Sequence, residues 1–465
     1  MRILRVIFAL ALLGGIARAQ WSTRVIDDSP IYYRATWASL AASGDTIHVF
    51  YNDWLVPSSP IRTMVKYARS TDAGVTWQFE TVDTFAHYAS ADVQIAWWRG
   101  ALALAGDGTP HVAYTVTFSG TSLALHAYRT PAGVWVRDTI EVQGTNPAIG
   151  YDAGIAMDHQ GRPHVAYNYY GGDTRYAWWN GSSWVVRDLA DGAGYGVALA
   201  LDANDNPHIG IGTLNDVRYA FSSDSGNTWT METIEGAWWQ VDIAVDNSDV
   251  PHLVYCRLNN DYRHAVRTGP NAWSVGTIEY VGQGNVCRAA VAVDASDEIH
   301  VAYYPCLSST LLKYAWSTDG GSNWATEDVT SAMPGSSCDL PGLAVVPNGK
   351  MIAYQPAYEV LGLASNLITG IAEELPTGAA ASTIARVRPI FDQAIRIELT
   401  QPLRHELRVS LYNSNGAMVL QRTYPAGIGS AVLADGDVGR LAPGAYFLAL
   451  TSEGWRQQVK VLKVR

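Results

Sequence analysis

The stretch Val197–Trp229, VALALDANDNPHIGIGTLNDVRYAFSSDSGNTW, decides the fold. Apolar and polar residues alternate in short runs, and turns rich in Asp, Asn, Gly and Pro separate the runs. A period of two is typical of β-strands with one buried face, and these turn residues favour tight connections. With the strand that follows from Trp229 to Ile234, the stretch predicts one antiparallel sheet of four strands.

The same pattern recurs along the chain, and the strand PHIGI within it aligns most easily with its repeats. Its anchor positions are His48, His111, His164, His208, His252, His300 and Met351. By subtraction they lie 63, 53, 44, 44, 48 and 51 residues apart. Periods of this size are typical of propeller blades or solenoid units.

The ends of the repeat predict how the array closes. The seventh unit, Leu340–Asn366, offers only three strands, while Trp21–Ile26 has the pattern of a fourth strand without a unit of its own. We expect Trp21–Ile26 to pair with the strand near Gly362–Ser365, which would remove the open sheet edges. The predicted fold class is therefore all-β: a seven-bladed propeller with four-stranded blades over residues 20–370.

Composition and charge exclude some partners and indicate a compartment. The formal net charge is -11 and no basic run interleaves with aromatic residues, so nucleic acid is not an expected partner. The first residues combine Arg2 and Arg5 with an apolar run and end in Ala17-Arg18-Ala19. This pattern predicts a signal peptide over 1–19 and a secreted or cell-surface protein, with no segment long enough to span a membrane.

Beyond the propeller the sequence predicts a linker and a second domain. Residues 371–383 are rich in small residues, Pro and Gly, which is typical of a linker. Residues 384–465 contain four alternating strands, IRIELT, LRVSLYN, MVLQRTY and YFLALT, which favour a β-sandwich.

Four cysteines in an exported chain suggest disulfides. Cys256 and Cys306 end the second strands of successive units, and Cys287 and Cys338 each lie thirteen residues before the next anchor. The equivalent positions of these cysteines in successive units favour the pairs Cys256–Cys287 and Cys306–Cys338. The other two pairings stay open.

Three units share a turn with one pattern before their last strand. The turns are Ser70-Thr-Asp72-Ala-Gly74-Val-Thr-Trp77, Ser222-Ser-Asp224-Ser-Gly226-Asn-Thr-Trp229 and Ser317-Thr-Asp319-Gly-Gly321-Ser-Asn-Trp324. They resemble the Asp boxes, or BNR repeats, of sialidase-like propellers. We expect a structural role, in which Asp accepts backbone N–H bonds, Gly takes positive φ and Trp covers the blade interior. In that superfamily the boxes lie on the face opposite the active site.

The C-terminal domain resembles the sorting domain of the type IX secretion system of Bacteroidetes-like bacteria. The resemblance covers about eighty residues and rests on Pro389, on Leu411–Val419 (LYNSNGAMV), on Leu441–Leu450 (LAPGAYFLAL) and on the basic ending KVLKVR. It implies export from a Gram-negative-type bacterium through outer-membrane machinery. The alternative is a plain adhesive β-sandwich.

In a propeller, ligands are expected where loops enter the inner strands and leave the second strands, around the mouth of the channel. The candidate ligand-binding residues there are Arg34, Trp37, Trp54, Asp92, Tyr151, Asp152, Tyr195, Trp239, Asp242, Arg288 and Asp339. Aromatic faces beside carboxylates suit sugar rings, so a glycan or a surface protein is the expected partner. The alternative is that these rings only fill the channel.

Catalysis has weaker support. Sialidase-like hydrolases need three arginines, a Tyr nucleophile with a Glu partner, and an Asp acid/base. Here Arg34 and Arg288 could be two of the arginines, with Arg257 a strained third, and the mouth loops offer no clear Tyr–Glu pair. The candidate acids of an Asp-based glycosidase are Asp152 and Asp242.

No cofactor or metal is expected. The repeated histidines sit one to a blade and cannot converge on one ion, so we expect them to bond to turn groups such as the Asp six residues earlier. The sequence therefore predicts a secreted or surface-displayed propeller that binds glycan or protein ligands, and the alternative is a divergent sialidase-like glycoside hydrolase.

Overall fold

The computed structural model describes most of the chain from Trp21 onward. The described residues are 21–28, 33–55, 61–87, 93–95, 100–118, 121–143, 150–169, 173–189, 194–237, 240–257, 261–281, 289–305, 311–330, 340–347, 349–357, 360–367, 385–387, 390–391, 394–399, 403–413, 418–433, 438, 440–441, 444–452 and 455–463. Within strands, some side chains are also left undescribed, among them those of residues 34, 54 and 151. The chain divides into two compact units, and one of them is Trp21–Asn366.

Trp21–Asn366 contains seven antiparallel sheets, which are the blades. Blade 1 holds β2 (Tyr33–Ser43), β3 (Thr46–Leu55), β4 (Ile61–Ser70) and β5 (Gln78–His87); blade 2 holds β6 (Val93–Ile95), β7 (Ala101–Leu104), β8 (Pro110–Phe118), β9 (Thr121–Arg129) and β10 (Trp135–Gln143); blade 3 holds β11 (Gly150–Met157), β12 (Pro163–Tyr169), β13 (Thr174–Trp179) and β14 (Trp184–Asp188). Blade 4 holds β15 (Gly196–Leu201), β16 (Pro207–Gly212), β17 (Val217–Phe221) and β18 (Thr230–Glu235); blade 5 holds β19 (Val241–Val245), β20 (Pro251–Cys256), β21 (Asp261–Gly269) and β22 (Ala272–Tyr280). Blade 6 holds β23 (Ala289–Val293), β24 (Ile299–Tyr303), β25 (Lys313–Ser317) and β26 (Ala325–Asp328); blade 7 holds β27 (Gly342–Val346), β28 (Gly349–Ala357), β29 (Val360–Ser365) and β1 (Ser22–Asp27).

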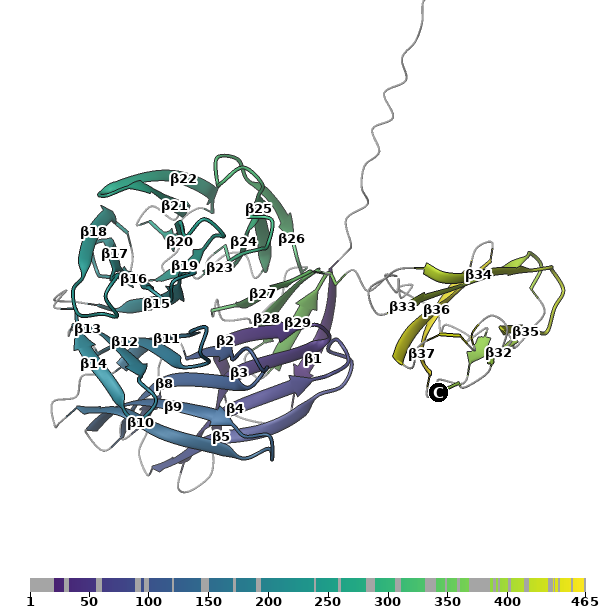
Figure 1. Cartoon of the computed structure of the whole chain (residues 1–465), viewed down its shortest axis with the longest axis horizontal. Coiled ribbons are helices and arrows are strands. Elements are labelled where there is room, and N and C mark those ends of the chain that lie inside the picture. Colours follow the sequence, from purple (N-terminus) through teal and green to yellow (C-terminus); the bar gives the residue numbers. More distant parts are fainter. Residues whose placement is uncertain are drawn as a thin grey trace, which may run out of the picture. The chain divides into compact units, whose positions relative to one another are not determined.

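The ring closes through the first strand, as the sequence predicts. β1 pairs antiparallel with β29 from Ser22 opposite Ser365 to Asp27 opposite Leu361, so the N-terminal strand is the fourth strand of blade 7. In Figure 1 the inner strands β11, β15, β19, β23 and β27 face the centre and strands such as β14, β18 and β22 lie at the periphery. The seven-bladed all-β propeller is confirmed, and blade 2 differs from the prediction of four strands only in its split inner strand, where β6 and β7 both pair with β8.

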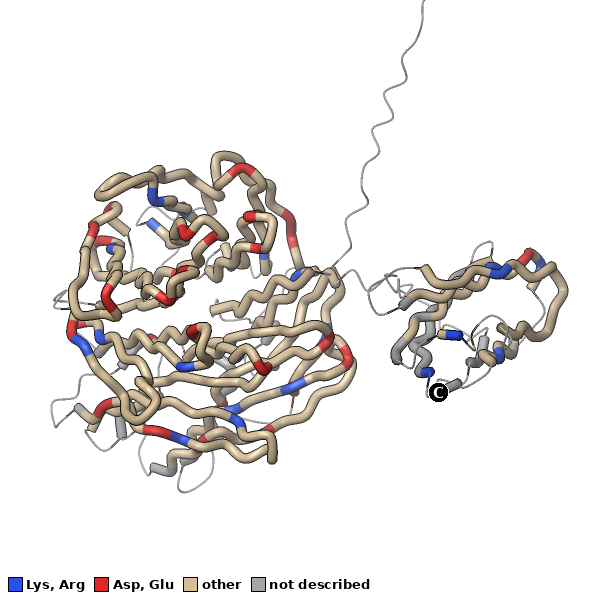
Figure 2. The backbone as a smooth tube through the Cα atoms, in the orientation of Figure 1, with Lys and Arg blue, Asp and Glu red and all other residues tan. Residues whose placement is uncertain are grey.

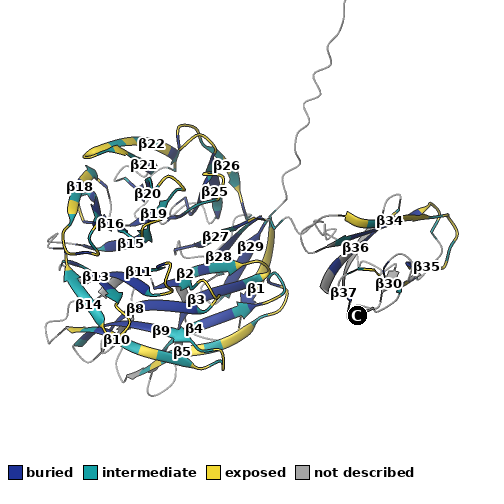
Figure 3. Ribbon diagram, viewed as in Figure 1, coloured by how far each residue is buried: buried dark blue, intermediate teal, exposed yellow. Residues whose placement is uncertain are grey.

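Burial follows the position of a strand within its blade. Second strands such as β16 and β20 are buried throughout, whereas outer strands such as β18 and β22 are mostly exposed or half-buried, with one buried residue each (Figure 3). Stacked blades cover both faces of each second strand, which is why these strands are almost continuously apolar in the sequence.

The anchor histidines join the second and third strands of a blade. His48 Nδ1 lies 2.5 Å from Tyr67 Oη, and the same bond joins His164 to Tyr176 at 2.6 Å. In blades 2 and 5 the third-strand ring is instead a histidine, as in the His252–His264 pair at 2.9 Å. The anchors of blades 3 to 6 also lie 3.3 to 3.5 Å from the predicted Asp six residues earlier, in the pairs Asp158–His164, Asp202–His208, Asp246–His252 and Asp294–His300. The predicted structural role of these histidines is confirmed.

Tryptophan side chains join neighbouring blades. In blades 2 to 7 the Trp at the start of the fourth strand packs edge-on against the third-strand ring of the preceding blade. The ring centroids lie 5.0 to 5.3 Å apart in Trp135–Tyr67, Trp184–His126, Trp229–Tyr176, Trp273–Tyr219, Trp324–His264 and Trp21–Tyr314. Such pairs stabilise beyond their buried area by about 0.5 to 1.5 kcal/mol each.

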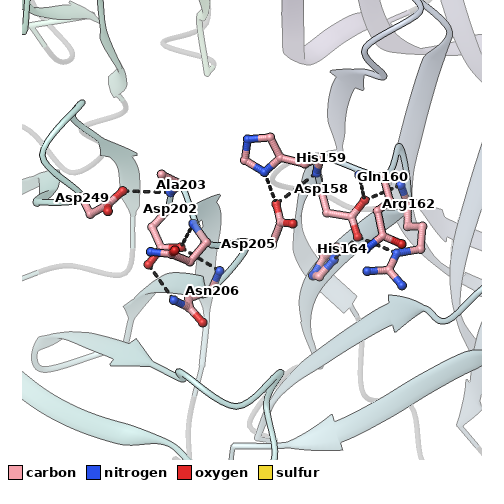
Figure 4. A network of polar contacts seen from close by, with 11 residues as sticks. Asp158, His159, Gln160, Arg162, His164, Asp202, Ala203, Asp205, Asn206 and Asp249 are labelled. Carbon is pink, nitrogen blue, oxygen red and sulfur yellow. Dashed lines mark hydrogen bonds and ion pairs between the residues drawn. The ribbon is translucent and has the colours of Figure 1, made fainter.

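The inner hairpin turns of blades 3 to 6 are linked in series. Figure 4 shows Asp158 Oδ1 accepting the N–H groups of Gln160 and Arg162 at 2.9 and 2.7 Å, which fixes the turn of blade 3. The N–H of His159, the residue between Asp158 and Gln160, instead donates to the Asp205 carboxylate in the turn of blade 4 at 3.0 Å. The same link runs from blade 4 to 5 and from 5 to 6, in Ala203–Asp249 and Asn247–Asp297.

The three turns of the Ser-x-Asp-x-Gly-x-x-Trp pattern, called here the Ser-x-Asp turns, share one geometry. In the turn of blade 4, Ser222 Oγ donates to Asp224 Oδ1 at 2.8 Å and accepts the Gly226 N–H at 2.8 Å. The N–H of Thr228 donates to the same Asp224 oxygen at 2.8 Å. The turns of blades 1 and 6 repeat these bonds with Asp72 and Asp319. The Asp therefore holds the turn, as expected from the sequence.

We expect Gly226→Ala to destabilise the propeller more than Gly161→Ala. Both glycines have positive φ, 81° and 74°, so both alanines carry a backbone cost of about 1 to 2 kcal/mol. A Cβ at Gly226 would also lie 2.7 Å from Tyr176 Cδ1, which adds about 1 to 3 kcal/mol, whereas nothing lies within 4 Å of a Cβ at Gly161. Urea unfolding of both variants measures the difference, and equal losses would contradict the proposed contact.

The C-terminal strands form two small sheets around one core. The first contains β30 (Ala385–Val387), β32 (Ile395–Leu399) and β35 (Ser430–Leu433), and the second contains β31 (Ile390–Phe391), β33 (Leu407–Asn413), β34 (Met418–Tyr424), β36 (Gly444–Ser452) and β37 (Trp455–Lys463). Ile397 and Leu433 from the first sheet and Val409 and Leu448 from the second are fully buried in the same cluster. The basic C-terminal segment is thus largely a strand, β37, paired along β36.

Candidate functional site

The topology places the predicted mouth loops on one rim. Inner strands begin, and second strands end, at the same edge of each blade, while the hairpin turns around Asp158, Asp202 and Asp246 lie at the other edge. Most loops of the rim lie outside the described residues, so the site there is described through the strand ends and the channel below them.

The channel below the rim is narrow and lined mainly by small or apolar residues. A cavity of about 150 Å³ lies between the inner strands. Its lining includes Ser39, Ala101, Gly154, Ala198, Asp242, Ala290 and Gly342, one residue from each blade. A Cβ on Gly154 would lie 2.8 Å from the Leu199 backbone nitrogen, so glycine permits this close approach of neighbouring inner strands.

The two candidate catalytic acids tie neighbouring blades together. Asp242 is 5% exposed, and its Oδ2 accepts the Val291 N–H of the next blade at 2.9 Å. Asp152 is fully buried, and its Oδ2 lies 3.4 Å from the donor nitrogen of Val197, again in the next blade. The structure therefore gives both carboxylates a role in blade packing, and Asp152 is not exposed for contact with a ligand.

Trp37 lies in the core rather than on the rim. Its side chain is fully buried, packs against Phe50 with ring centroids 5.1 Å apart, and would lie 2.6 Å from a Cβ placed on Gly100. Burial of this kind is typical of a core tryptophan, so Trp37 is not placed to contact a ligand.

Of the other rim candidates, Tyr195 is described. It is half-buried, and its N–H donates to the Gly212 carbonyl at 2.8 Å. Arg34 pairs with Asp53 in the β2–β3 ladder, while its side chain and those of Trp54 and Tyr151 are not described. The remaining rim candidates, Asp92, Trp239, Arg288 and Asp339, lie outside the described residues.

Three of the four cysteines also lie outside the described residues. Cys256 ends β20 and is buried. The proposed pairing of Cys256 with Cys287, and of Cys306 with Cys338, therefore stays a prediction.

Buried tyrosines bonded to carboxylates recur between blades, and sequence reasoning missed them. Tyr167 donates to Glu141 at 2.9 Å, and the same tie appears as Tyr51–Asp27, Tyr114–Asp83, Tyr255–Glu235 and Tyr303–Glu279. Each joins a second strand to the fourth strand of the preceding blade, and burial raises the pKa of Tyr114 well above its ordinary value. These pairs include Tyr with Glu, as a sialidase requires, but each of these tyrosines is at most 1% exposed.

The acidic cluster Asp294, Glu298 and His300 has ligand atoms within 4.8 Å of one another. Asp294 is already engaged, since its Oδ1 accepts two backbone N–H groups at 2.8 and 3.0 Å. The same Asp–His arrangement occurs in blades 3, 4 and 5, which indicates a turn-stabilising role.

Comparison with known proteins gives no family. No family model matches the chain, and no curated protein matches it. Among solved structures, it is similar to the BP39L lectin of Burkholderia pseudomallei, with 13% identity over 72% of this chain and 97% of that one and a TM-score of 0.47. It is also similar to the NanB sialidase of Streptococcus pneumoniae, with 13% identity, coverage of 75% and 71%, and a TM-score of 0.44.

A further similar structure is PorZ of Porphyromonas gingivalis, described as an essential bacterial surface component of the type-IX secretion system. The identity is 12%, the alignment covers 95% of this chain and 61% of that one, and the TM-score is 0.42. This chain is a closed seven-bladed propeller. That assignment rests on its own strand pairing, and similarities this distant support no inference about ligand or activity. In the described part of the chain, no helix has the length and apolar character of a membrane span.

Proposed function

We propose that the chain is an exported propeller that binds glycan or protein ligands at the rim of its channel mouth. The closed ring of seven blades supports this, because it brings loops from every blade to one rim. The channel beneath offers about 150 Å³, less than the roughly 300 Å³ of small ligand pockets. A ligand at this face would therefore be held by the rim loops rather than inside the channel.

The alternative is a divergent sialidase-like glycoside hydrolase using Asp152 and Asp242. Glycosidases need two carboxyl groups that reach the scissile bond, one of them able to donate a proton. Here Asp152 is fully buried and both acids accept backbone N–H bonds from the next blade. This use of the carboxylates favours binding over hydrolysis.

The mature chain beginning at Gln20 is expected to bind one or more members of an array of glycans and surface proteins and to cleave no fluorogenic glycoside. Trp54→Ala and Trp239→Ala are expected to weaken this binding at least about tenfold, because aromatic anchors supply much of the energy of such sites. Val134→Ala is the control, since this side chain is 59% exposed on the opposite face.

Two results would contradict the proposal. Binding that neither rim variant changes would remove the rim as the site. Turnover that Asp152→Asn or Asp242→Asn abolishes, in variants with unchanged circular dichroism, would establish the hydrolase alternative.

Export is the second half of the proposal. The two-sheet domain after residue 384 would act as a type IX sorting domain that directs the propeller to outer-membrane machinery. Support comes from the motif at Leu441–Leu450, whose residues 444–450 lie on β36, and from the basic ending, whose described part lies on β37. The signal peptide over 1–19 lies outside the described residues and remains part of the proposal.

A further inference from the structure

A groove of about 1060 Å³ lies on the face opposite the rim, between blades 2 and 3. It is bordered by the inner hairpin turns of blades 2, 3 and 4 and by the third and fourth strands of blades 2 and 3. Its volume is slightly above the range of about 300 to 1,000 Å³ for small-ligand pockets. Tyr128, Asp138, Trp179 and Trp184 are among its lining residues.

At two other blade interfaces the corresponding space is filled by a Glu–Arg–Trp cluster. Between blades 1 and 2, Arg129 donates two hydrogen bonds from Nε and one from Nη2 to Glu80 at 2.7 to 3.0 Å, and Trp135 Nε1 donates to the same carboxylate at 2.8 Å. Between blades 4 and 5 the cluster recurs as Glu232, Arg267 and Trp273. These side chains close the gap between the blades.

Between blades 2 and 3 two members of this cluster are replaced. Asp138 faces His126 in the ladder where Glu80 faces Tyr67, so the acid is one methylene shorter. Trp179 pairs with Trp184 where Arg129 pairs with Trp135, so a ring stands in place of the cation. This interface lacks the Glu–Arg bonds that fill the corresponding space between blades 1 and 2 and between blades 4 and 5, and the groove lies here.

Because of these replacements, polar groups that line the groove lack the hydrogen-bond partners that the equivalent groups have between blades 1 and 2 and between blades 4 and 5. Trp184 Nε1 is buried and has no hydrogen-bond partner among the described residues. The Nε1 atoms of Trp77 and Trp229 also have no hydrogen-bond partner among the described residues. These two rings, however, lie beneath the glycines of the Ser-x-Asp turns, because a Cβ on Gly74 or Gly226 would lie 3.6 or 3.3 Å from them. Asp138 retains 38% side-chain exposure, and its Oδ2 lies 3.5 Å from His126 Nδ1.

The charges of the lining exclude some ligand classes. Five carboxylates line the groove, Asp107, Asp138, Asp158, Asp202 and Asp205, against the single cation Arg129, which Glu80 already binds. Figure 2 shows acidic residues spread over the propeller turns. An anionic ligand such as a sialylated or phosphorylated sugar would be repelled. A simple cation would satisfy the acids but could not accept the Trp184 N–H.

We propose that this groove binds a neutral glycan, with Trp179 stacking on a sugar ring, Trp184 Nε1 donating to a hydroxyl and Asp138 accepting from one. A hydroxyl group both donates and accepts, so a neutral sugar can satisfy both side chains at once. The apolar face of a pyranose suits the half-buried ring of Trp179. This site is independent of the rim, because it lies on the opposite face and rests on other residues.

The test uses the mature full-length chain on a panel of neutral oligosaccharides, with sialylated oligosaccharides as the anionic comparison. We expect neutral members to bind, and Trp179→Ala and Asp138→Asn each to weaken this binding about tenfold or more. Trp184→Phe keeps a ring and removes only the N–H donor, and it should weaken binding by a smaller factor. Val142→Ala, at a position 60% exposed on β10 and outside the groove, should bind like the parent.

The decisive variant rebuilds the cluster of the other interfaces. Asp138→Glu combined with Trp179→Arg should close the groove and abolish binding, while the thermal midpoint stays equal to or above that of the parent. Unfolding therefore cannot explain the loss. The proposal is overturned if no neutral oligosaccharide binds at millimolar concentration, if sialylated members bind as tightly as neutral ones, or if the double variant binds like the parent. Binding sensitive to Trp239→Ala but not to the double variant would leave the rim proposal standing and remove this one.

Discussion

A mature chain that lacks Trp21–Asp27 is expected to lose cooperative folding. This segment holds β1, the strand that closes the ring, so its removal would leave β29 as an exposed sheet edge. Leu361 and Leu363 of β29, which are at most 1% exposed in the complete chain, would then be uncovered on one side. It would also remove the Trp21 Nε1 bond to Glu327 at 2.7 Å and the buried Tyr51 bond to Asp27 at 2.8 Å.

The expected loss is comparable to the whole stability of a domain. Removing the 5% exposed side chain of Ile26 costs about 2 to 5 kcal/mol, and a buried tyrosine hydroxyl without its acceptor costs about 1 to 3 kcal/mol more. Net stabilities are about 5 to 15 kcal/mol. We expect a broad thermal transition and aggregation, measured by near-ultraviolet circular dichroism and size-exclusion chromatography.

A synthetic peptide of residues 20–28 should partly restore the transition in a concentration-dependent way, because a ligand that binds only the folded state stabilises it. Val25→Ala is the matched control within the same strand, since Val25 is 53% exposed. A truncated chain that unfolds as sharply and at the same temperature as the parent would show that the ring does not depend on β1.

The repeat made the architecture predictable, because it sets the number of blades and leaves Trp21–Ile26 as the one strand without a place. The anchor histidines were predictable for the same reason, since the Asp that each one contacts lies six residues away in the same turn. The hydrogen bond between Tyr51 and Asp27 was not predictable from the repeat, because Asp27 belongs to another blade and becomes a neighbour of Tyr51 only after the ring has closed.

The candidate site was predicted less well, because residue type does not report burial. Trp37 and Asp152 have the chemistry of a sugar site, yet both side chains are fully buried. The groove between blades 2 and 3 was not predicted, because its signal is the absence of a Glu–Arg pair that two other blade interfaces contain. Alignment of the blades would have shown the signal, which is Trp179 at the position of Arg129 and Arg267.

The propeller is expected to lose stability as the pH falls from about 6.5 to about 4. Burial lowers the pKa of His48 and His111 to about 4, and burial with the neighbouring His252 lowers that of His264 to about 3. The unfolded chain binds these protons near pH 6.5 and the folded chain does not, so protonation favours unfolding within this window. For His264 alone, the loss between pH 6.5 and 4.5 is about 2 to 3 kcal/mol.

His264→Tyr isolates this contribution. Tyrosine occupies the same third-strand position in four other blades, where Tyr67, Tyr176, Tyr219 and Tyr314 each bond to the anchor histidine, so the variant should fold. Urea midpoints measured from pH 7.5 to 4.5 should fall less steeply for His264→Tyr than for the parent. His159→Gln, which removes a side chain 70% exposed, should follow the parent. Identical pH dependence of His264→Tyr and the parent would show that the buried His252–His264 pair does not set the acid limit, because a tyrosine at this position takes up no proton in this range.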